Sequence, residues 1–196
     1  KDRRSAFLFG DGGVAALVER DEKFGKSYFS LNSDGSRADL IMIKGGGYRH
    51  PSSEETLREK VVDEYGNIRS DEQGYMQGGD VFNFVIREIP RDIKKTLEYA
   101  GDTADSFDYI VFHQANNFIN AYIAKKMKLD TDKIPSTIAK YGNTSSVSVP
   151  LTIVSELKDR LYGNKKLLLS AFGVGMTWAT GIVPFVDCKI SDIVEV

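Results

Sequence analysis

Two polar side chains in this sequence could act together on one oxygen atom. His113 directly follows the apolar run 109–112, and Asn143 stands just before a helical pattern that begins near Ser145. The ends of strands and the starts of helices expose functional groups in α/β sheets, so the two residues can converge with the glycine-rich segment 172–178. A neutral imidazole N–H and an amide N–H would then donate to the same oxygen. Each residue also has a structural alternative, as a buried hydrogen-bonded histidine and as a helix N-cap or turn residue.

The remaining candidates for chemistry are few. His50, the other histidine, lies next to Pro51 in a polar stretch and is expected to be solvated. Cys188 is the single cysteine, so it can form no internal disulfide and cannot build a cysteine-based zinc site. We therefore expect no metal site and a reducing compartment, the cytoplasm. A hydrolase built on Cys188, His113 and Asn143 would need the thiol within about 3–4 Å of the imidazole.

The composition excludes several classes of protein. The chain has 196 residues, 41% of them hydrophobic and 28% charged, so it can bury a sizeable core. A net charge of −2 gives no broad field that would bind nucleic acid or an anionic membrane. Residues 167–186 carry no charge and are numerous enough to span a membrane, but glycines and Pro184 interrupt them. Two short strands around a glycine turn are the better interpretation.

The elements that would position these residues alternate between strand and helix. Apolar runs predict strands at 6–9, 14–18 and 28–31. A helical stripe from Phe82 to Leu97 ends at Gly101, and Pro90 is expected to kink or split that helix. The pattern then predicts, in order, a strand, two helices and two strands at 109–112, 116–127, 145–161, 167–172 and 177–185. This alternation indicates a layered α/β fold with ligands at the carboxyl ends of strands.

Several motifs occur in a fixed order over nearly the whole chain. They are Asp2-Arg3, Phe9-Gly10-Asp11-Gly12, Ser33-Asp34-Gly35, Met76 with Gly78 and Val81-Phe82, His113 to Asn116, Lys125-Lys126, Tyr141 to Ser145, and Phe172 to Trp178. In these motifs the sequence resembles the thiolase-like condensing enzymes, specifically 3-oxoacyl-acyl-carrier-protein synthase III. The resemblance implies an α/β, layered α-β-α-β-α fold. Residues 1–43 would be the last strands of its N-terminal half, 44–75 a connecting excursion or lid, and 76–196 the C-terminal half.

The resemblance also implies an acyltransferase that performs a decarboxylative Claisen condensation. In that family a cysteine takes an acyl group from coenzyme A, and malonyl-acyl carrier protein loses carbon dioxide and attacks the thioester. His113 and Asn143 match the two donors to the malonyl thioester oxygen, each worth about 3–4 kcal/mol by analogy with oxyanion holes. The backbone N–H of Val174 would serve the acyl-transfer oxyanion. The family implies a cytoplasmic homodimer in fatty-acid or related biosynthesis, with coenzyme A thioester as substrate and no cofactor.

Further residues match substrate-binding positions of the family. Arg3 would stack on the adenine of coenzyme A, while Phe82 and Phe172 would contact substrate, the latter at the acyl channel. A surface arginine and core aromatic residues are the alternatives.

Two lysines and two departures bear on the carrier protein. Lys125 and Lys126 match basic residues that meet coenzyme A phosphates or the acidic carrier, although a solvated helix face explains them equally. Phe118 and Asn83 stand where the family can have an arginine and a lysine, which weakens the basic patch.

The nucleophilic cysteine of the family precedes the segment that matches residues 1–13. We therefore expect the nucleophile to be absent from this sequence, and the chain alone to be inactive. Two function classes remain open. The chain is part of a condensing acyltransferase, or it is a non-catalytic half that partners a separately made N-terminal half.

Overall fold

A four-stranded mixed sheet organises the chain. The computed structural model describes residues 7–18, 20, 22 and 24–195, and the sheet has the strand order β1-β8-β7-β6. β1 (Tyr28–Ser33) pairs antiparallel with β8 (Thr177–Val186), and β8 pairs antiparallel with β7 (Asn164–Gly173). β7 pairs parallel with β6 (Tyr109–Phe112). The carboxyl ends of β6 and β7 therefore share one edge of the sheet, where residue 113 and the turn 174–176 follow.

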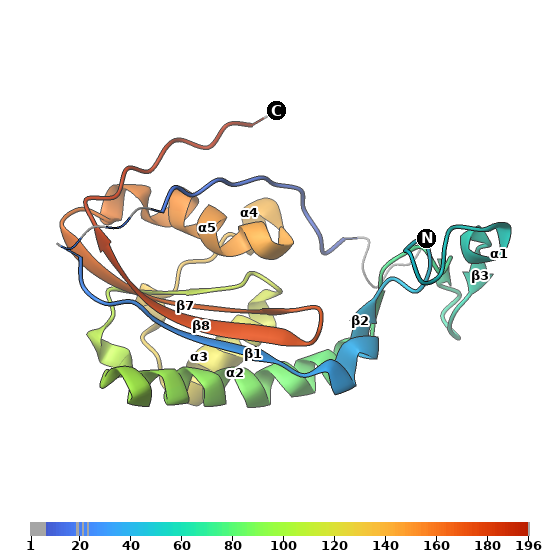
Figure 1. Cartoon of the computed structure of the whole chain (residues 1–196), viewed down its shortest axis with the longest axis horizontal. Coiled ribbons are helices and arrows are strands. Elements are labelled where there is room, and N and C mark those ends of the chain that lie inside the picture. The colour runs from blue at the N-terminus through green and yellow to red at the C-terminus, as the bar shows by residue number, and fades with distance from the viewer. Residues whose placement is uncertain (1–6, 19, 21, 23, 196) are drawn as a thin grey trace.

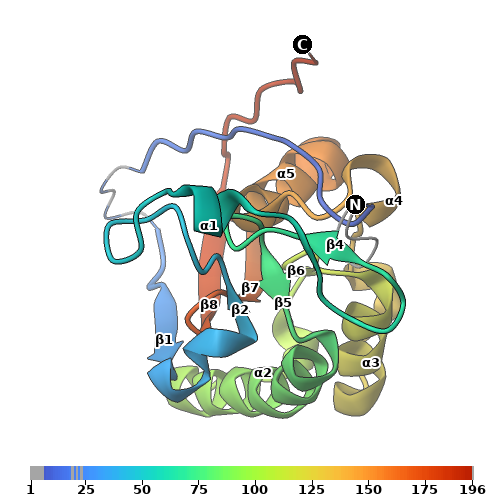
Figure 2. The same ribbon diagram turned by 90° about the vertical axis from the view of Figure 1, so that its right-hand side faces the viewer.

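Helices cover both faces of this sheet, which gives three layers (Figure 1). α2 (Gly78–Ala100) and α3 (Asn117–Met127) lie on one face, and α4 (Ile138–Tyr141) and α5 (Ser148–Thr152) lie on the other, as the end view in Figure 2 also shows. Short 3-10 helices occur at Gly35–Leu40, Ala104–Ser106 and Thr131–Lys133. None of the helices in the described ranges combines the length and the apolar character needed to cross a bilayer.

The core consists of two apolar clusters on opposite faces of the sheet. Ile110 and Phe112 of β6 pack with the α2 cluster, whereas Val111 between them packs with Leu157 and Leu167 on the α5 side. This alternation is the side-chain period of a strand buried on both faces. It confirms the predicted strand at 109–112, and the strands predicted at 167–172 and 177–185 are confirmed within β7 and β8.

α2 confirms the predicted apolar stripe and its end. Gly101 adopts a left-handed conformation (φ 69°), and the next N–H, of Asp102, bonds the Leu97 carbonyl at 2.9 Å. Of the predicted kink or split at Pro90, the split is wrong, because α2 runs through Pro90 without a break. The kink stays a prediction. Proline provides no N–H for the carbonyl of residue 86, four positions earlier. Lys126 Nζ of α3 donates to that carbonyl at 2.7 Å instead.

The helix predicted over 145–161 is present but irregular. A 3-10 turn at Ser145–Val147 leads into α5, which continues as a π-helical segment Ile153–Leu157 and a 3-10 turn Lys158–Arg160. The segment is rich in β-branched residues and contains Pro150, both of which lower the preference for regular α-helix. The helix predicted at 116–127 is confirmed as α3, with Asn116 as its N-cap.

The strands predicted at 6–9 and 14–18 are not strands over their described residues. Residues 10–18 form no regular element, and Phe9 makes one isolated parallel bridge with Asn143. The side chains of Phe7, Leu17 and Val18 stay exposed. An apolar run becomes a strand only when a neighbouring strand supplies a ladder, and the described part of the chain supplies none here. The third strand predicted in this region is confirmed as β1.

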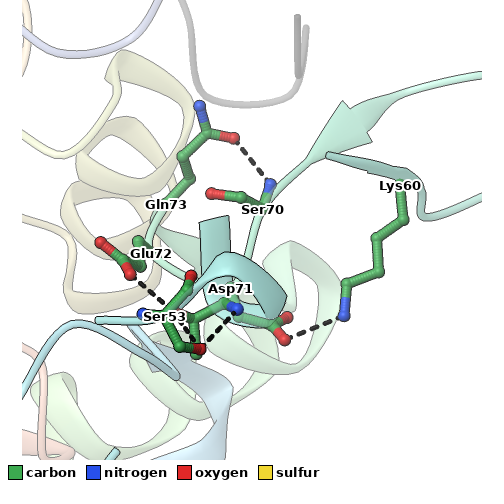
Figure 3. Close-up of polar contacts among 7 residues, drawn as sticks. Ser53, Lys60, Ser70, Asp71, Glu72 and Gln73 are labelled. Atoms are coloured by element: carbon green, nitrogen blue, oxygen red, sulfur yellow. Dashed lines mark hydrogen bonds and ion pairs between the residues drawn. The ribbon is translucent and has the colours of Figure 1, made fainter. Parts of the chain in front are cut away.

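The excursion at 44–75 forms a small unit to one side of the sheet (Figure 1). β2 (Ile41–Met42) and β5 (Tyr75–Met76) pair at its neck, and it contains α1 (Glu54–Leu57) and the pair β3 (Lys60–Val61) and β4 (Ile68–Arg69). Polar contacts connect its parts, and Figure 3 shows several of them. Glu72 accepts from Thr56 Oγ1 at 2.6 Å, and Lys60 donates to Asp71 at 2.9 Å. The Thr56 hydroxyl is the largest cause that lowers the pKa of Glu72.

Candidate active site

A cavity of about 680 Å³ opens at the edge of the sheet where β6 and β7 end. His113 and Asn143 both line it, together with three of the other residues singled out from the sequence, Phe82, Phe172 and Val174. Most of the other lining side chains are apolar, among them Leu8, Phe9, Leu31, Ile41, Met76, Val81, Ile119 and Trp178. The structure thus brings five predicted site residues to one hollow.

His113 is buried and neutral. Its backbone N–H donates to the Ser170 carbonyl at 2.8 Å, which continues the β6–β7 pairing by one residue. Its ring packs against Phe172 in a T-shaped arrangement, with 5.2 Å between the ring centroids. The Nδ1 atom of the ring lies 2.7 Å from Ser148 Oγ. Burial lowers the pKa of His113 to about 4, and a hydrogen bond to the Ser145 backbone partly opposes this shift. At neutral pH the ring therefore has one N–H and one lone pair.

Asn143 is held by both its backbone and its side chain. Its N–H donates to the Leu8 carbonyl at 2.9 Å, and its carbonyl accepts from the Gly10 N–H at 3.1 Å. Its Oδ1 accepts from the Ser145 N–H at 2.9 Å. Because the carboxamide oxygen is used in this bond, the NH₂ group is the part left to donate.

A glycine is required on each side of this pairing. Gly142 has φ 65°, and a Cβ there would lie 2.9 Å from the Leu8 carbonyl oxygen. A Cβ on Gly10 would lie 2.0 Å from the Tyr141 carbonyl oxygen. The close approach of segment 7–10 to Asn143 therefore depends on both glycines.

Two serines that were not predicted as site residues, Ser145 and Ser148, hold these donors in place. Ser145 contacts both donor residues, since its N–H binds Asn143 and its backbone forms a hydrogen bond with His113. Its backbone adopts the left-handed region (φ 54°), a strained conformation for a non-glycine residue. Ser148 is buried and contacts the imidazole. One signal was available for Ser148, a single hydroxyl between Val147 and Val149 at the start of a helical pattern.

Comparisons with known proteins show similarity over most of the chain. Residues 97–185 match the family model described as 3-oxoacyl-(acyl-carrier-protein) synthase III C terminal. Beta-ketoacyl-(acyl-carrier-protein) synthase III of Streptococcus pneumoniae is 35% identical over 186 residues, which is 93% of this chain and 53% of that protein. Over most of its length this chain is similar to the C-terminal part of 3-oxoacyl-acyl-carrier-protein synthase III proteins. It spans about half the length of the curated relatives it matches.

Solved structures of the family share the fold. A 2.1 Å crystal structure of a 3-oxoacyl-(acyl-carrier-protein) synthase III is 36% identical, with a TM-score of 0.81 over 93% of this chain and 55% of that one. The corresponding enzyme of Thermus thermophilus is 31% identical, with a TM-score of 0.76 over 93% and 53%. The expected thiolase-like α/β fold is therefore confirmed, and the similarity lies in the C-terminal part of these proteins.

The other synthase III positions lie around or beyond the cavity. Phe82 stacks on Phe118 at 5.5 Å between ring centroids, so an aromatic pair occupies the place where the family can have an arginine. Val174 is 62% exposed in the turn between β7 and β8, and its carbonyl accepts from Thr177 Oγ1 at 2.8 Å. The oxyanion role of the Val174 N–H stays a prediction. Arg3 lies outside the described residues.

Lys125 and Lys126 are exposed in the last turn of α3 and do not line the cavity. Lys126 is tied to the Ile86 carbonyl, whereas no such contact is seen for Lys125 in the part of the chain that the structure describes. Their expected contact with coenzyme A or a carrier protein stays a prediction. The two adjacent lysines therefore differ in a way that their sequence positions did not show.

Cys188 is exposed and does not line the cavity. Val186 lies six residues along β8 from Thr180, which pairs with Ser170 next to His113. Six residues of strand span roughly 20 Å, at about 3.4 Å each. A Cys188–His113 pair is therefore excluded, and with it the hydrolase alternative. No group of three or more potential metal-binding side chains occurs within the described ranges.

Proposed function

We propose that this chain is the C-terminal part of a synthase III acyltransferase that condenses an acyl-coenzyme A with malonyl-acyl carrier protein in fatty-acid or related biosynthesis. Its contribution is the pair of donors His113 and Asn143, and the nucleophilic cysteine comes from residues outside this sequence. One observation carries the proposal: a neutral buried imidazole and an oriented carboxamide line the same largely apolar cavity and share contacts with Ser145.

The chemistry of decarboxylation requires such donors. When the carbon–carbon bond of the malonyl thioester breaks, carbon dioxide leaves and the electron pair moves onto the thioester as an enolate. Two N–H groups aimed at the enolate oxygen stabilise this charge by about 3–4 kcal/mol each in a site with little water. The enolate carbon then attacks the acyl-cysteine thioester, a carbon–carbon bond forms, and the cysteine thiolate leaves. A neutral His113 suits the first step because it donates without bringing a charge into an apolar cavity.

The surroundings support the substrate assignment. Three aromatic side chains line the cavity, Phe82, Phe172 and Trp178. Their apolar surfaces suit an acyl chain or the narrow, extended part of a thioester substrate. In the proposed enzyme the Val174 N–H binds the acyl-transfer oxyanion, and Arg3, Lys125 and Lys126 meet the phosphates of coenzyme A or the acidic carrier. The reaction uses coenzyme A thioester as substrate without a cofactor. The proposal includes a cytoplasmic homodimer for the complete enzyme.

The test separates the two half-reactions. In the complete enzyme, His113→Ala and Asn143→Ala should each slow malonyl decarboxylation by about 10²-fold or more, the usual effect of removing one oxyanion donor. Self-acylation by acyl-coenzyme A should change much less. Asp132→Asn, an exposed change in a 3-10 turn remote from the cavity, is the matched control. Equal losses in both half-reactions would remove the assigned roles.

A second candidate function is a non-catalytic half that associates with a separately made partner. Exposed Phe29 and Leu31 on β1, 61% and 80% accessible, favour a partner at that face. On either candidate, the isolated chain should form no acyl-enzyme with acetyl-coenzyme A, as mass spectrometry can check. Stable acylation of Cys188 would contradict both.

A further inference from the structure

A neutral imidazole has two forms, and only one of them can donate from a given nitrogen. With the proton on Nδ1, the Nε2 atom presents a lone pair, and with the proton on Nε2 it presents a donor. For His113 the tautomer can be inferred because Nδ1 has a defined partner, Ser148 Oγ, at 2.7 Å. The form of the ring therefore depends on which of these two atoms donates.

The hydrogen bonds of Ser148 decide between the two forms. Its Oγ already accepts a proton from the Gln114 N–H at 3.2 Å. If Nδ1–H also donated to Oγ, the hydroxyl proton would have no acceptor in the part of the chain that the structure describes. Ser148 is 1% exposed, so water is not available as a substitute. A buried donor without a partner is costly, whereas donation from the hydroxyl to Nδ1 gives that proton an acceptor. In this form the ring's hydrogen bond to the Ser145 backbone comes from Nε2–H.

The groups around Ser148 are fixed as well. Gln114 is fully buried, with its Nε2 donating to the Phe112 carbonyl at 2.7 Å and its Oε1 accepting from the Thr137 N–H at 3.0 Å. The His113 carbonyl accepts from Asn120 Nδ2 at 3.1 Å. The Gln114 N–H that binds Ser148 is therefore held in place, and so is the backbone that carries the imidazole.

We propose that Ser148 is a positioning residue that donates its hydroxyl proton to His113 Nδ1 and so fixes the ring proton on Nε2. Only the catalytic consequence rests on the proposed function: with the proton on Nε2, the ring offers the enolate oxygen a hydrogen-bond donor. With the proton on Nδ1, it would present a lone pair to that oxygen. The distribution of the proton itself can be measured in this chain without any activity.

Nitrogen NMR of selectively ¹⁵N-histidine-labelled protein at pH 7.5 is the direct experiment. The chain has two histidines, and exposed His50 serves as the internal reference for a ring free to exchange between both forms. We expect His113 Nδ1 to give an unprotonated signal and Nε2 a protonated one. The reverse assignment in the wild-type protein, with the Nδ1 proton donated to Ser148 or to the Ser145 carbonyl, overturns the proposal.

Three variants test the cause. Ser148→Ala should reduce the preference for the Nε2 proton by about tenfold, the ratio that corresponds to one hydrogen bond of ordinary strength. Ser148→Thr keeps the hydroxyl and should retain the wild-type signals. Ser146→Ala is the control, because Ser146 is exposed and lines the same cavity.

An unchanged tautomer ratio in Ser148→Ala refutes the proposal, and if that variant does not fold, the wild-type assignment still decides. The outcome is also separate from the proposed function. If a His113→Ala enzyme condensed its substrates normally, the proposed function would be contradicted. The tautomer assignment would not be affected.

Discussion

Replacing Lys126 by methionine tests how α2 tolerates a proline in its interior. Pro90 is buried within the helix and supplies no N–H to the Ile86 carbonyl. Lys126 Nζ donates a hydrogen bond to that carbonyl at 2.7 Å. Methionine keeps most of the side-chain length but removes both the donor and the charge that lies 6.0 Å from the Tyr122 ring centroid, so a cycle with Pro90→Ala is needed to isolate the hydrogen bond.

The expected loss of unfolding free energy is about 1 kcal/mol. A hydrogen bond to a charged group contributes about 1.5–3 kcal/mol, and exposure of the lysine to solvent reduces this value. For a chain of this size the loss corresponds to a decrease in melting temperature of about 2–4 °C. Lys125→Met, on the same exposed turn, should stay within about 0.5 kcal/mol of wild type.

A double-mutant cycle with Pro90→Ala provides the sharp assay. Alanine at position 90 restores an N–H for the Ile86 carbonyl, so in that background Lys126→Met should cost almost nothing. Urea unfolding of the wild type, both single variants and the double variant gives a coupling free energy, expected near 1 kcal/mol. A cost of Lys126→Met that is the same with proline and with alanine would show that the lysine does not compensate for Pro90.

Two further predictions concern the site. Since burial lowers the pKa of His113 from its ordinary 6.5 to about 4, the unfolded chain binds a proton in that pH window that the folded chain does not. The unfolding free energy should therefore fall by up to about 3 kcal/mol from this group as the pH falls from 6.5 to 4. Urea unfolding at several pH values measures this change. His113→Asn should flatten the dependence of the unfolding free energy on pH. Gly10→Ala should detach segment 7–10 from Asn143, because its Cβ would meet the Tyr141 carbonyl, and hydrogen exchange at the Asn143 N–H should accelerate while global stability stays nearly unchanged. Gly13→Ala, whose Cβ meets open space, should leave that exchange rate as it is.

Elements that bury a periodic apolar face could be predicted from the sequence. The stripe on α2 and the runs of β6, β7 and β8 supply most of the residues of the two core clusters, so their spacing reflects the packing. The runs at 6–9 and 14–18 look the same in sequence but have no ladder partner in the described residues, and pairing is a property of the fold rather than of the run. The same reasoning explains Pro90, whose compensation comes from Lys126, a residue on another helix.

The candidate site shows a similar division. His113 and Asn143 could be found because each stands at the end of a strand or the start of a helix. Ser148 stands out in the sequence as one hydroxyl between two valines, but this does not assign it a role, since its contact with His113 joins residues 35 positions apart. Ser145 acts through its backbone, which the residue type does not reveal.

The neck of the excursion has a consequence for how this part of the chain can vary. β2 and β5 place Met42 opposite Tyr75, so the chain leaves the core and returns to it at one point. A loop whose ends already meet imposes little strain on its base, and the entropy of closing it grows slowly with length. The unit between these strands can thus be lengthened, shortened or exchanged as a module, with the sheet beneath it unaltered.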